Sequence, residues 1–414
     1  MENQQTLNDF PTIDVWVDTD GSPLIKVDYD YNFQGKNINL DYNDAFYSFF
    51  RWHFENYVKS IKRKRIGHDV VNQGNINLVV APCPDFPNLV DSIENITPEV
   101  YHWCKSNNVK IAICLTRETP FITDIPILDM VIKDSLINRK FRSSVVKIII
   151  SGYDYPNNMC YPNYVVPIDV WRRSLSFVIS GTKNDPDQIK LSKNRKYNFS
   201  LLTGALYTRW HRVLFLAKCN HLNLLDDKFF YSVCALNEKR DLDYIKELTK
   251  EYETYGPYIE ADKSIFKHRI YDKDGKLMTS EETIYDDREE YFTPPQVLDS
   301  YVHIVLETVH WSPTLTEKIF KPIVAGLPFV WHGHQDILPY LESLGFKRYS
   351  HINYSFDSGP NPLTRLELLI KEVQRLNKMD LKMLAYTNRK ISKHNQQVFK
   401  SICKDYGELW EKLK

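Results

Sequence analysis

The hydrophobic residues in the second half of the chain form short continuous runs separated by longer amphipathic stretches. Apolar runs bounded by turn residues are typical of strands that are buried on both faces of a parallel sheet. Apolar residues recurring at intervals of three and four are typical of helices that cover such a sheet. Strands are therefore predicted at 197–203, 229–233, 301–306 and 329–331, and helices at 209–217, 241–255, 314–326, 335–344, 361–378 and 380–413.

The first half shows a similar alternation that is less regular. Its apolar runs lie at 76–80, 109–115 and 145–150, and residues 92–106 have helical spacing. Short apolar strands that alternate with helices predict a parallel sheet in this half as well. The whole chain is therefore predicted to be α/β, with one sheet in each half.

Two further elements are predicted before this alternation begins. Residues 12–30 have the pattern of a β-hairpin whose strands join at Asp18–Gly21, because an Asp-Gly pair favours a tight turn. Residues 43–66 have helical spacing and end in a basic run that includes Lys62 and Arg65. Such a run is usually a solvated face, although contact with phosphate groups is the alternative.

One polar stretch separates the two halves of the chain, and another interrupts the strand–helix pattern of the second half. Residues 181–196 are polar and contain Pro and Gly, so the domain boundary is placed there. Residues 256–296 are polar and irregular, with a hairpin predicted at Asp272–Gly275. A loop of that length is typically a functional segment or a lid.

Composition and charge narrow the class of protein. A chain of 414 residues is long enough for two domains of about 200 residues each. Its 53 basic and 53 acidic side chains balance, which argues against a dedicated nucleic-acid-binding protein but leaves room for a local basic groove. The seven cysteines form no Cys-x-x-Cys pair, so neither a zinc knuckle nor a disulfide framework is indicated. A polar start and the lack of a long apolar run predict a cytoplasmic protein without a membrane span.

The segment from Tyr301 to Phe346 carries the clearest functional signal. A predicted strand is followed by a loop, a helix and a second strand, which together form a βαβ unit. Thr314 or Thr316 suits the N-cap of the helix, and Glu317 suits its first turn. In an open parallel sheet, ligands bind at the carboxyl ends of the strands, where helix N-termini present free N–H groups. Glu317 and Lys318 are therefore predicted to lie at a ligand-binding edge.

Three stretches of this segment resemble the donor-binding half of GT-B glycosyltransferases, most closely the fucosyltransferase-like branch and related phage-encoded enzymes. They are Thr-Glu-Lys-Ile-Phe-Lys-Pro at 316–322, Ala-Gly-Leu-Pro-Phe-Val at 325–330 and Leu-Glu-Ser-Leu-Gly-Phe at 341–346. The resemblance covers residues 195–355 and does not reach the first half. It implies two Rossmann-like domains that face each other across a cleft. The expected division is 1–190 for the acceptor side, 191–385 for the nucleotide-sugar side, and 386–414 for a C-terminal helix that packs back towards the first domain.

The resemblance also implies which residues bind the donor. A basic residue at the start of the helix after 197–203 contacts the diphosphate, which is Arg209 or Arg212 in this chain. Glu317 contacts the ribose and Lys318 contacts the phosphates. Four more candidates for the donor site are Thr316, Lys321, His332 and Gly333. Each has a structural alternative. Thr316 could simply cap the helix, and Lys321 could be a solvated side chain. His332 and Gly333 could make only a polar loop contact.

Three acids are candidates for the catalytic base. Asp85, Glu118 and Asp154 each follow a predicted strand of the first half, where they would face the expected cleft. Asp18-Thr19-Asp20 has the form of a metal-binding Asp-x-Asp motif, but the turn is the simpler interpretation. His332-Gly333-His334 lacks further ligands for a metal. The expected enzyme is therefore independent of metal and needs no cofactor besides its nucleotide-diphosphate-sugar donor.

The acceptor and the competing functions stay open at this stage. The predicted reaction transfers a sugar to an acceptor hydroxyl, either of a glycan or of hydroxymethylated bases in phage DNA. The basic stretch 59–65 would contact DNA in the second case, in the cytoplasm of the infected host. An inactive nucleotide- or sugar-binding protein of the same fold is the alternative function. A generic dinucleotide-binding enzyme is disfavoured because no Gly-x-Gly-x-x-Gly follows a predicted strand.

Overall fold

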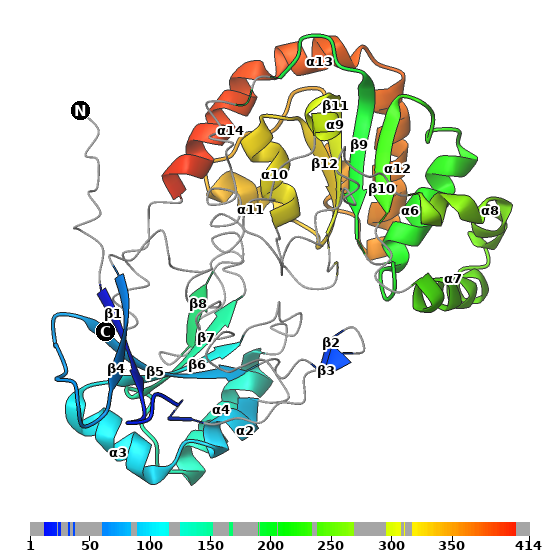
Figure 1. The fold of residues 1–414 in the computed structure, drawn as a ribbon. Helices are drawn as coiled ribbons and strands as arrows, with labels where there is room; N and C mark the ends of the chain where they lie inside the picture. The colour runs from blue at the N-terminus through cyan, green and yellow to red at the C-terminus, as the bar shows by residue number, and fades with distance from the viewer. Residues whose placement is uncertain are drawn as a thin grey trace. The chain divides into compact units, whose positions relative to one another are not determined.

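The chain divides into two compact units in its structure, a computed structural model (Figure 1). Unit 1 comprises residues 1–176 and 403–414, and unit 2 comprises residues 177–402. The structure describes residues 12–22, 24–25, 32–33, 36–37, 60–83, 89–115, 125–151, 165–168, 189, 191–204, 206–233, 238–268, 295–307, 310 and 317–402.

Unit 2 is built on a parallel sheet of four strands in the order β10-β9-β11-β12. The strands are β9 (Tyr197–Thr203), β10 (Phe229–Val233), β11 (Ser300–Leu306) and β12 (Phe329–His332). Every residue of the last three is buried, which explains why they appear in the sequence as continuous apolar runs. The order reverses between β9 and β11, because the chain leaves β9 in one direction and β11 in the other.

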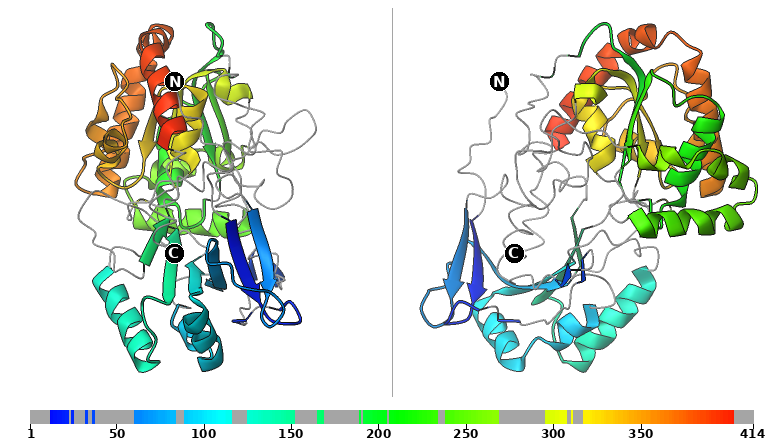
Figure 2. Two further views of the ribbon diagram at one scale, coloured as in Figure 1. Left: turned by 90° about the vertical axis from the view of Figure 1, so that its left-hand side faces the viewer. Right: turned by 45° about the vertical axis from the view of Figure 1, so that its right-hand side comes forward.

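Helices cover both faces of this sheet. In both figures α10 and α14 lie on one face, and α6 and α12 lie on the other (Figures 1 and 2). The larger helices are α6 (Trp210–His221), α7 (Glu238–Glu251), α10 (Glu317–Ala325), α11 (Ile337–Ser343), α12 (Pro362–Asn377), α13 (Leu381–Thr387) and α14 (Arg389–Ile402). A doubly wound sheet of this kind is the predicted Rossmann-like half.

The local sequence accounts for how α12 begins and what it buries. The side chain of Asn361 accepts a hydrogen bond from the backbone of Thr364 at 2.8 Å, and Pro362 occupies the first helical position. Leu366, Leu369, Ile370, Val373 and Leu376 are buried at helical spacing. This apolar stripe holds the helix on the sheet.

Two predictions for unit 2 are wrong in detail. Residues 256–267 were expected in an irregular loop but form α8 (Gly256–Ala261) and a 3-10 helix, η4 (Lys263–Lys267). Pro257 near the start of α8 and the side-chain cap of Asp262 on η4 make these short helices possible. The predicted helix 380–413 is interrupted at Asn388, whose side chain bonds to the backbone of Ser350 instead. The hairpin predicted at Asp272–Gly275 lies outside the described residues.

Three short elements complete the description of unit 2. They are α9 (Pro295–Leu298), which leads into β11, η6 (Tyr354–Phe356), and the helix-terminating turn at Gly326, where φ is +71°. The described part of the C-terminal segment, α14, packs on α10 through the rings of Phe320 and Phe399. The expectation that 386–414 packs towards the first half therefore rests on residues after 402, which lie outside the described residues.

Unit 1 contains a second parallel sheet, of six strands in the order β4-β1-β5-β6-β7-β8. The strands are β1 (Thr12–Val17), β4 (Ser60–Arg65), β5 (Ile76–Cys83), β6 (Lys110–Leu115), β7 (Val146–Ser151) and β8 (Val165–Ile168), and β2 (Asn32–Phe33) and β3 (Lys36–Asn37) form a separate antiparallel pair. The described helices α2 (Leu89–Glu94), α3 (Pro98–Asn107) and α4 (Ile125–Asn138) lie on one face (Figure 1).

The N-terminal hairpin prediction is wrong. β1 pairs in parallel with β4 and β5, whose residues are far away in the sequence. Asp18–Gly21 does form a turn, closed by a hydrogen bond from the Gly21 N–H to the Asp18 carbonyl. The turn ends β1, and residues 24–25, the described part of the predicted second strand, form a bend.

The helix predicted at 43–66 is also wrong over its described part, because residues 60–65 form the edge strand β4. Of its basic side chains, Lys62, Arg63 and Arg65 are exposed and Lys64 is half-buried, as expected for a solvated strand at the edge of a sheet. Lys and Arg on an edge strand oppose pairing with other chains, so the charges have a structural role here. The described structure gives no support to DNA as a partner of this stretch.

The predicted α/β class, with a parallel sheet in each half, is confirmed. Facing of the two halves across a cleft stays a prediction, as do the exact domain boundaries. No helix in the described ranges is long and apolar enough to span a membrane.

Candidate functional site

The carboxyl edge of the unit 2 sheet is the best candidate for a binding site. The strand order reverses between β9 and β11, and such a switch point leaves a crevice between the two strand ends. The N-terminus of α6 follows β9, and the N-terminus of α10 follows β11. Because the N–H groups of a first helical turn have no intrahelical partners, both helices direct donors and positive potential to this edge.

Three cationic side chains are buried around this edge. Arg212 in the first turn of α6 is 1% exposed, Lys318 at the start of α10 is 7% exposed and Arg365 in α12 is 5% exposed. Burial of a charge is costly unless partners or a ligand compensate it. A nitrogen of Arg212 lies 3.4 Å from the carbonyl of Leu306 at the end of β11, so α6 is tied to the neighbouring strand. These three cations share the edge with the buried acid Glu307, and the remaining excess of positive charge suits an anion.

Three histidines pack against one another beneath the edge. They are His211 of α6, His310 after β11 and His332 at the end of β12. The ring centroids of His211 and His332 are 5.0 Å apart and nearly parallel, and those of His211 and His310 are 4.9 Å apart. Trp210 adds a fourth ring at 4.9 Å from His310.

The hydrogen bonds of the cluster determine where each imidazole carries its proton. Backbone carbonyls only accept, so His211 donates from Nε2 to Glu307 at 2.9 Å, and His332 donates from Nε2 to Pro362 at 2.9 Å. His310 instead accepts at Nε2 from the indole N–H of Trp210 at 3.1 Å. Each ring therefore ties a loop or a helix end to its neighbour.

Burial keeps all three imidazoles neutral. It lowers the pKa of His310 to about 3 and that of His332 to about 4, and the charges of nearby His and Arg groups add to this. The pKa of His211 falls well below its ordinary value, mainly through burial and then through the two neighbouring histidines. Neutral imidazoles leave the positive charge of the edge to the lysine and arginines.

The loop after β12 packs directly on the end of β11. A Cβ atom added to Gly333 would lie 2.9 Å from Ile337 and 3.3 Å from the side chain of Glu307. The backbone N–H of Glu307 donates to the carbonyl of His332 at 2.9 Å. A larger residue at 333 would therefore require the Ile337 side chain to move.

A carboxylate already occupies the N-terminus of α11. Asp357 accepts hydrogen bonds from the backbone of Ile337 and Leu338 at 3.1 and 2.8 Å, and from the indole of Trp331 at 3.0 Å. Burial raises the pKa of Asp357 to about 6, against the effect of these donors. In α6, the capping residue Arg209 makes no side-chain capping bond. The backbone N–H of Trp210 bonds to Tyr244 and that of Arg212 donates to the Arg209 carbonyl, so the start of α6, unlike that of α11, carries no carboxylate cap among the described contacts.

We expect Asp357→Ala to lower the free energy of unfolding of unit 2 by about 2–3 kcal/mol. The change leaves three buried donors without their acceptor. Urea unfolding at neutral pH measures the loss. Asp380→Ala is the matched control, because Asp380 caps α13 from an exposed position and should lose only about 1 kcal/mol. Equal losses in the two variants would contradict the prediction.

The structure places most of the predicted donor-site residues at this one edge. Arg209 is half-buried, and its guanidinium contacts the hydroxyl of Thr208 at 2.6 Å, whereas Arg212 is fully buried. Lys321 is half-buried one turn after Lys318, near His303. Glu317 begins α10, but its side chain and all of Thr316 lie outside the described residues. Binding roles for these residues, and for His332 and Gly333, stay predictions.

The three candidate acids, Asp85, Glu118 and Asp154, lie outside the described residues. The strands before them, β5, β6 and β7, are adjacent and parallel, so their carboxyl ends meet at one edge of the unit 1 sheet. Asp18 and Asp20 accept backbone hydrogen bonds from Thr19 and Ser22 at 2.7 Å, as expected for turn residues. Across the described ranges, His, Cys, Asp and Glu form no group of three or more that could hold a metal ion.

Sequence reasoning missed the residues that organise the edge, notably His211, His310, Asp357 and Arg365. His211 stands between two recognised arginines and His310 follows a recognised strand, so their positions gave a weak signal. The contacts of Arg365 and Asp357 depend on segments that only the fold brings together.

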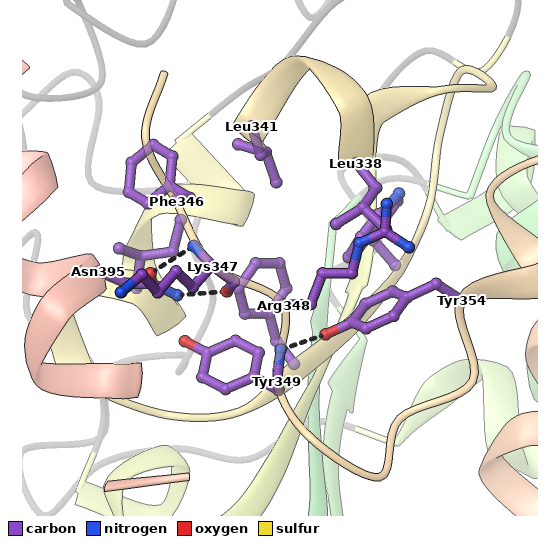
Figure 3. A pocket seen from close by; sticks show the side chains of 11 residues that line it. Leu338, Leu341, Phe346, Lys347, Arg348, Tyr349, Tyr354 and Asn395 are labelled. Carbon is purple, nitrogen blue, oxygen red and sulfur yellow. Dashed lines mark hydrogen bonds between the residues drawn. The ribbon is translucent and has the colours of Figure 1, made fainter. Parts of the chain in front are cut away.

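A small cavity elsewhere in unit 2 is a packing feature. It is lined by residues of α10, β12, α11, the following loop and α14, mostly apolar, and has room for about one water molecule (Figure 3). Asn395 exchanges two hydrogen bonds with the backbone of Lys347, and the Tyr354 hydroxyl accepts from the Tyr349 N–H at 3.0 Å. These polar groups already bond to one another within the protein, so they offer little to a ligand in the cavity.

Comparison with known proteins leaves the family open. No protein-family model matches the chain, and no curated protein matches its sequence. Among solved structures, an alpha1,3-fucosyltransferase is 8% identical to this chain, with 98% of this chain and 94% of that chain covered and a TM-score of 0.40. A structure of alpha1,3-fucosyltransferase with GDP is also 8% identical, with 98% of this chain and 93% of that chain covered and a TM-score of 0.42. An alpha,alpha-trehalose 6-phosphate synthase from Burkholderia multivorans is 11% identical, with 81% and 70% covered and a TM-score of 0.37. TM-scores below 0.5 carry no argument about function.

Proposed function

We propose that the protein is a glycosyltransferase that moves a sugar from a nucleotide-diphosphate sugar to an acceptor hydroxyl. The observation that carries the proposal is the switch point of the unit 2 sheet, where the N-termini of α6 and α10 bring buried Arg212 and Lys318 to one edge. The resemblance of 316–322 and 325–330 to a donor-binding segment supports it, because that segment forms the βαβ unit at this edge.

The proposed chemistry follows from the charges at the edge. Cleavage of the bond between sugar and diphosphate leaves negative charge on the diphosphate, and donors that are already in place stabilise that charge as it develops. The N-terminus of α6 and the cation of Lys318 supply such stabilisation without a metal ion. Neutral histidines beneath the edge hold the loops without adding a charge that would vary near neutral pH.

The proposed role of the first half is to bring the acceptor hydroxyl to the sugar. Asp85, Glu118 and Asp154 follow adjacent strand ends and are the candidates for the base that removes the hydroxyl proton. A glycan is the proposed acceptor class.

We expect one nucleoside diphosphate, or its sugar conjugate, to raise the thermal unfolding midpoint of the protein. At a hundred times its Kd, a ligand that binds only the folded state stabilises it by about 2.7 kcal/mol, which corresponds to a shift of roughly 5–10 °C for a domain of this size. A panel of GDP, UDP, ADP and CDP with their hexose conjugates measures this by scanning fluorimetry.

Repeating the panel in EDTA tests the metal-independence of binding, and the shift should persist. A shift that disappears in EDTA and returns with manganese would contradict metal-independence and revive Asp18-Thr19-Asp20 as a candidate. If no member of the panel stabilises the protein, the proposed donor site is wrong.

A further inference from the structure

Arg365 donates hydrogen bonds to backbone carbonyls of three different segments. One guanidinium nitrogen donates to Gly359 at 3.1 Å, and the other donates to His310 at 3.1 Å and to Gly333 at 3.3 Å. The side chain is 5% exposed. His310 belongs to the loop between β11 and α10, and Gly333 to the loop between β12 and α11. One side chain of α12 therefore joins both loops of the carboxyl edge.

The surrounding residues are shaped to hold Arg365 in place. A Cβ atom at Gly359 would lie only 2.8 Å from Cγ of Arg365, so the chain passes where a larger residue would displace the arginine. His332 donates to the carbonyl of Pro362 in the first turn of α12, which adds a second tie between β12 and this helix. Two independent contacts therefore fix the start of α12 against the β12 loop.

The two joined loops are those that the proposed donor site needs. The β11–α10 loop leads into Lys318, and the β12–α11 loop packs on Glu307 at the end of β11. A site held within a fraction of an ångström needs supporting contacts behind it. Three carbonyl contacts from one rigid, planar group provide such support.

We propose that Arg365 is a positioning residue that sets the spacing of the β11–α10 and β12–α11 loops and so preorganises the donor site. The inference rests on the proposed function for its consequence in binding, but its structural content is independent of it. Arg365 touches backbone carbonyls in this role and need not touch the substrate.

Arginine is required for this role because of its geometry. A guanidinium presents five N–H donors in a fixed plane, whereas a lysine ammonium is a compact point charge on a flexible stem. Arg365→Lys keeps the charge but loses the fork that spans the three carbonyls. The Arg365 charge also helps to lower the pKa values of His310 and His332, and this effect is retained in Arg365→Lys. The variant therefore isolates positioning from charge.

The experiment compares wild type, Arg365→Lys and Gly359→Ala by hydrogen–deuterium exchange and by calorimetric titration with GDP and with UDP. Gly359→Ala retains the arginine but displaces it, so it tests the same contact if Arg365→Lys fails to fold. Arg375→Lys is the matched control, because Arg375 also lies on α12 and donates to a backbone carbonyl, that of His351, at the far end of the helix.

We expect amide exchange in peptides covering 303–310 and 332–336 to rise about tenfold or more in Arg365→Lys, with β9 and β10 unchanged. We also expect the Kd for the nucleotide that binds wild type to rise about tenfold. Gly359→Ala should also raise both the loop amide exchange and the nucleotide Kd, and Arg375→Lys should change neither of these two quantities. A residue with a merely structural role would raise exchange throughout unit 2 instead.

Unchanged local exchange in both Arg365→Lys and Gly359→Ala would overturn the inference, as would a uniform rise across unit 2. If wild type binds neither GDP nor UDP, the proposed function fails for these donors, and the exchange measurement alone decides the role of Arg365. Changed loop exchange with unchanged nucleotide affinity would overturn the link between the loops and binding.

Discussion

Lys318→Ala is expected to lower turnover by a factor of roughly 30 to 1000, because it removes a cation placed where the leaving diphosphate develops charge. Lys318 is 7% exposed and lies at the N-terminal end of α10. Burial penalises the charge of a lysine and the positive helix end repels it, and the interactions of Lys318 within the protein offset part of this cost. A bound diphosphate reverses both effects. Initial rates with the donor identified by the nucleotide panel measure the change.

Two further variants make this result specific. Lys318→Arg retains a cation and should recover part of the lost rate. Lys371→Ala removes an exposed lysine from α12 and should leave the rate unchanged within about twofold. If Lys318→Ala turns over like wild type per folded molecule, the donor site lies elsewhere. If it loses stability while its turnover per folded molecule is unchanged, Lys318 has a structural role.

Unit 2 is expected to unfold in mild acid, between about pH 4 and 5, and this is the largest effect on stability that the structure predicts. His211, His303, His310 and His332 are buried, and burial lowers the pKa of each, to about 3 for His303 and His310 and about 4 for His332. Ser200 and Ser300 form a buried hydrogen-bonded chain with His303, which leaves little room for a solvated charge.

The sign follows from the protons bound in each state. An unfolded histidine binds a proton below about pH 6.5, whereas in the folded state His303 and His310 stay neutral until about pH 3 and His332 until about pH 4, and the pKa of His211 is also well below its ordinary value. The folded state is therefore fully favoured above pH 6.5 and loses stability as the pH falls towards 4. Each group contributes about 1.4 kcal/mol per pH unit within that window. Asp357 acts in the opposite direction between about pH 4 and 6, because its folded pKa is raised.

The net expectation near pH 5 is a loss of about 4 kcal/mol per pH unit, against a total stability of about 5–15 kcal/mol. Urea unfolding followed at several pH values measures the slope. His303→Asn should reduce the slope by about one proton, or 1.4 kcal/mol per pH unit. His351→Asn is the control, because His351 is exposed and asparagine tolerates its positive φ of 67°. A stability that does not change between pH 7 and 5 would contradict the prediction.

The elements that could be predicted are those whose signal is local. β11 and β12 are continuous apolar runs because a parallel strand between two helical layers is buried on both faces. The start of α10 and its end at Gly326 follow from first-turn chemistry and from a glycine with positive φ. The hairpin failed for the opposite reason: the partner of β1 is β4, with Thr12 opposite Ser60, and local spacing cannot indicate a pairing over that distance.

The sequence by itself determined the order of strands and helices in unit 2, and hence the edge at which Arg212 and Lys318 meet. Parallel βα connections leave little choice in this, since each helix must begin at the carboxyl end of the strand before it. Only the tertiary structure decided which side chains hold that edge. His211 and its acceptor Glu307 are 96 positions apart, and Arg365 and His310 are 55 apart. Such contacts depend on where distant backbone carbonyls come to lie, and periodicity along the chain carries no information about that.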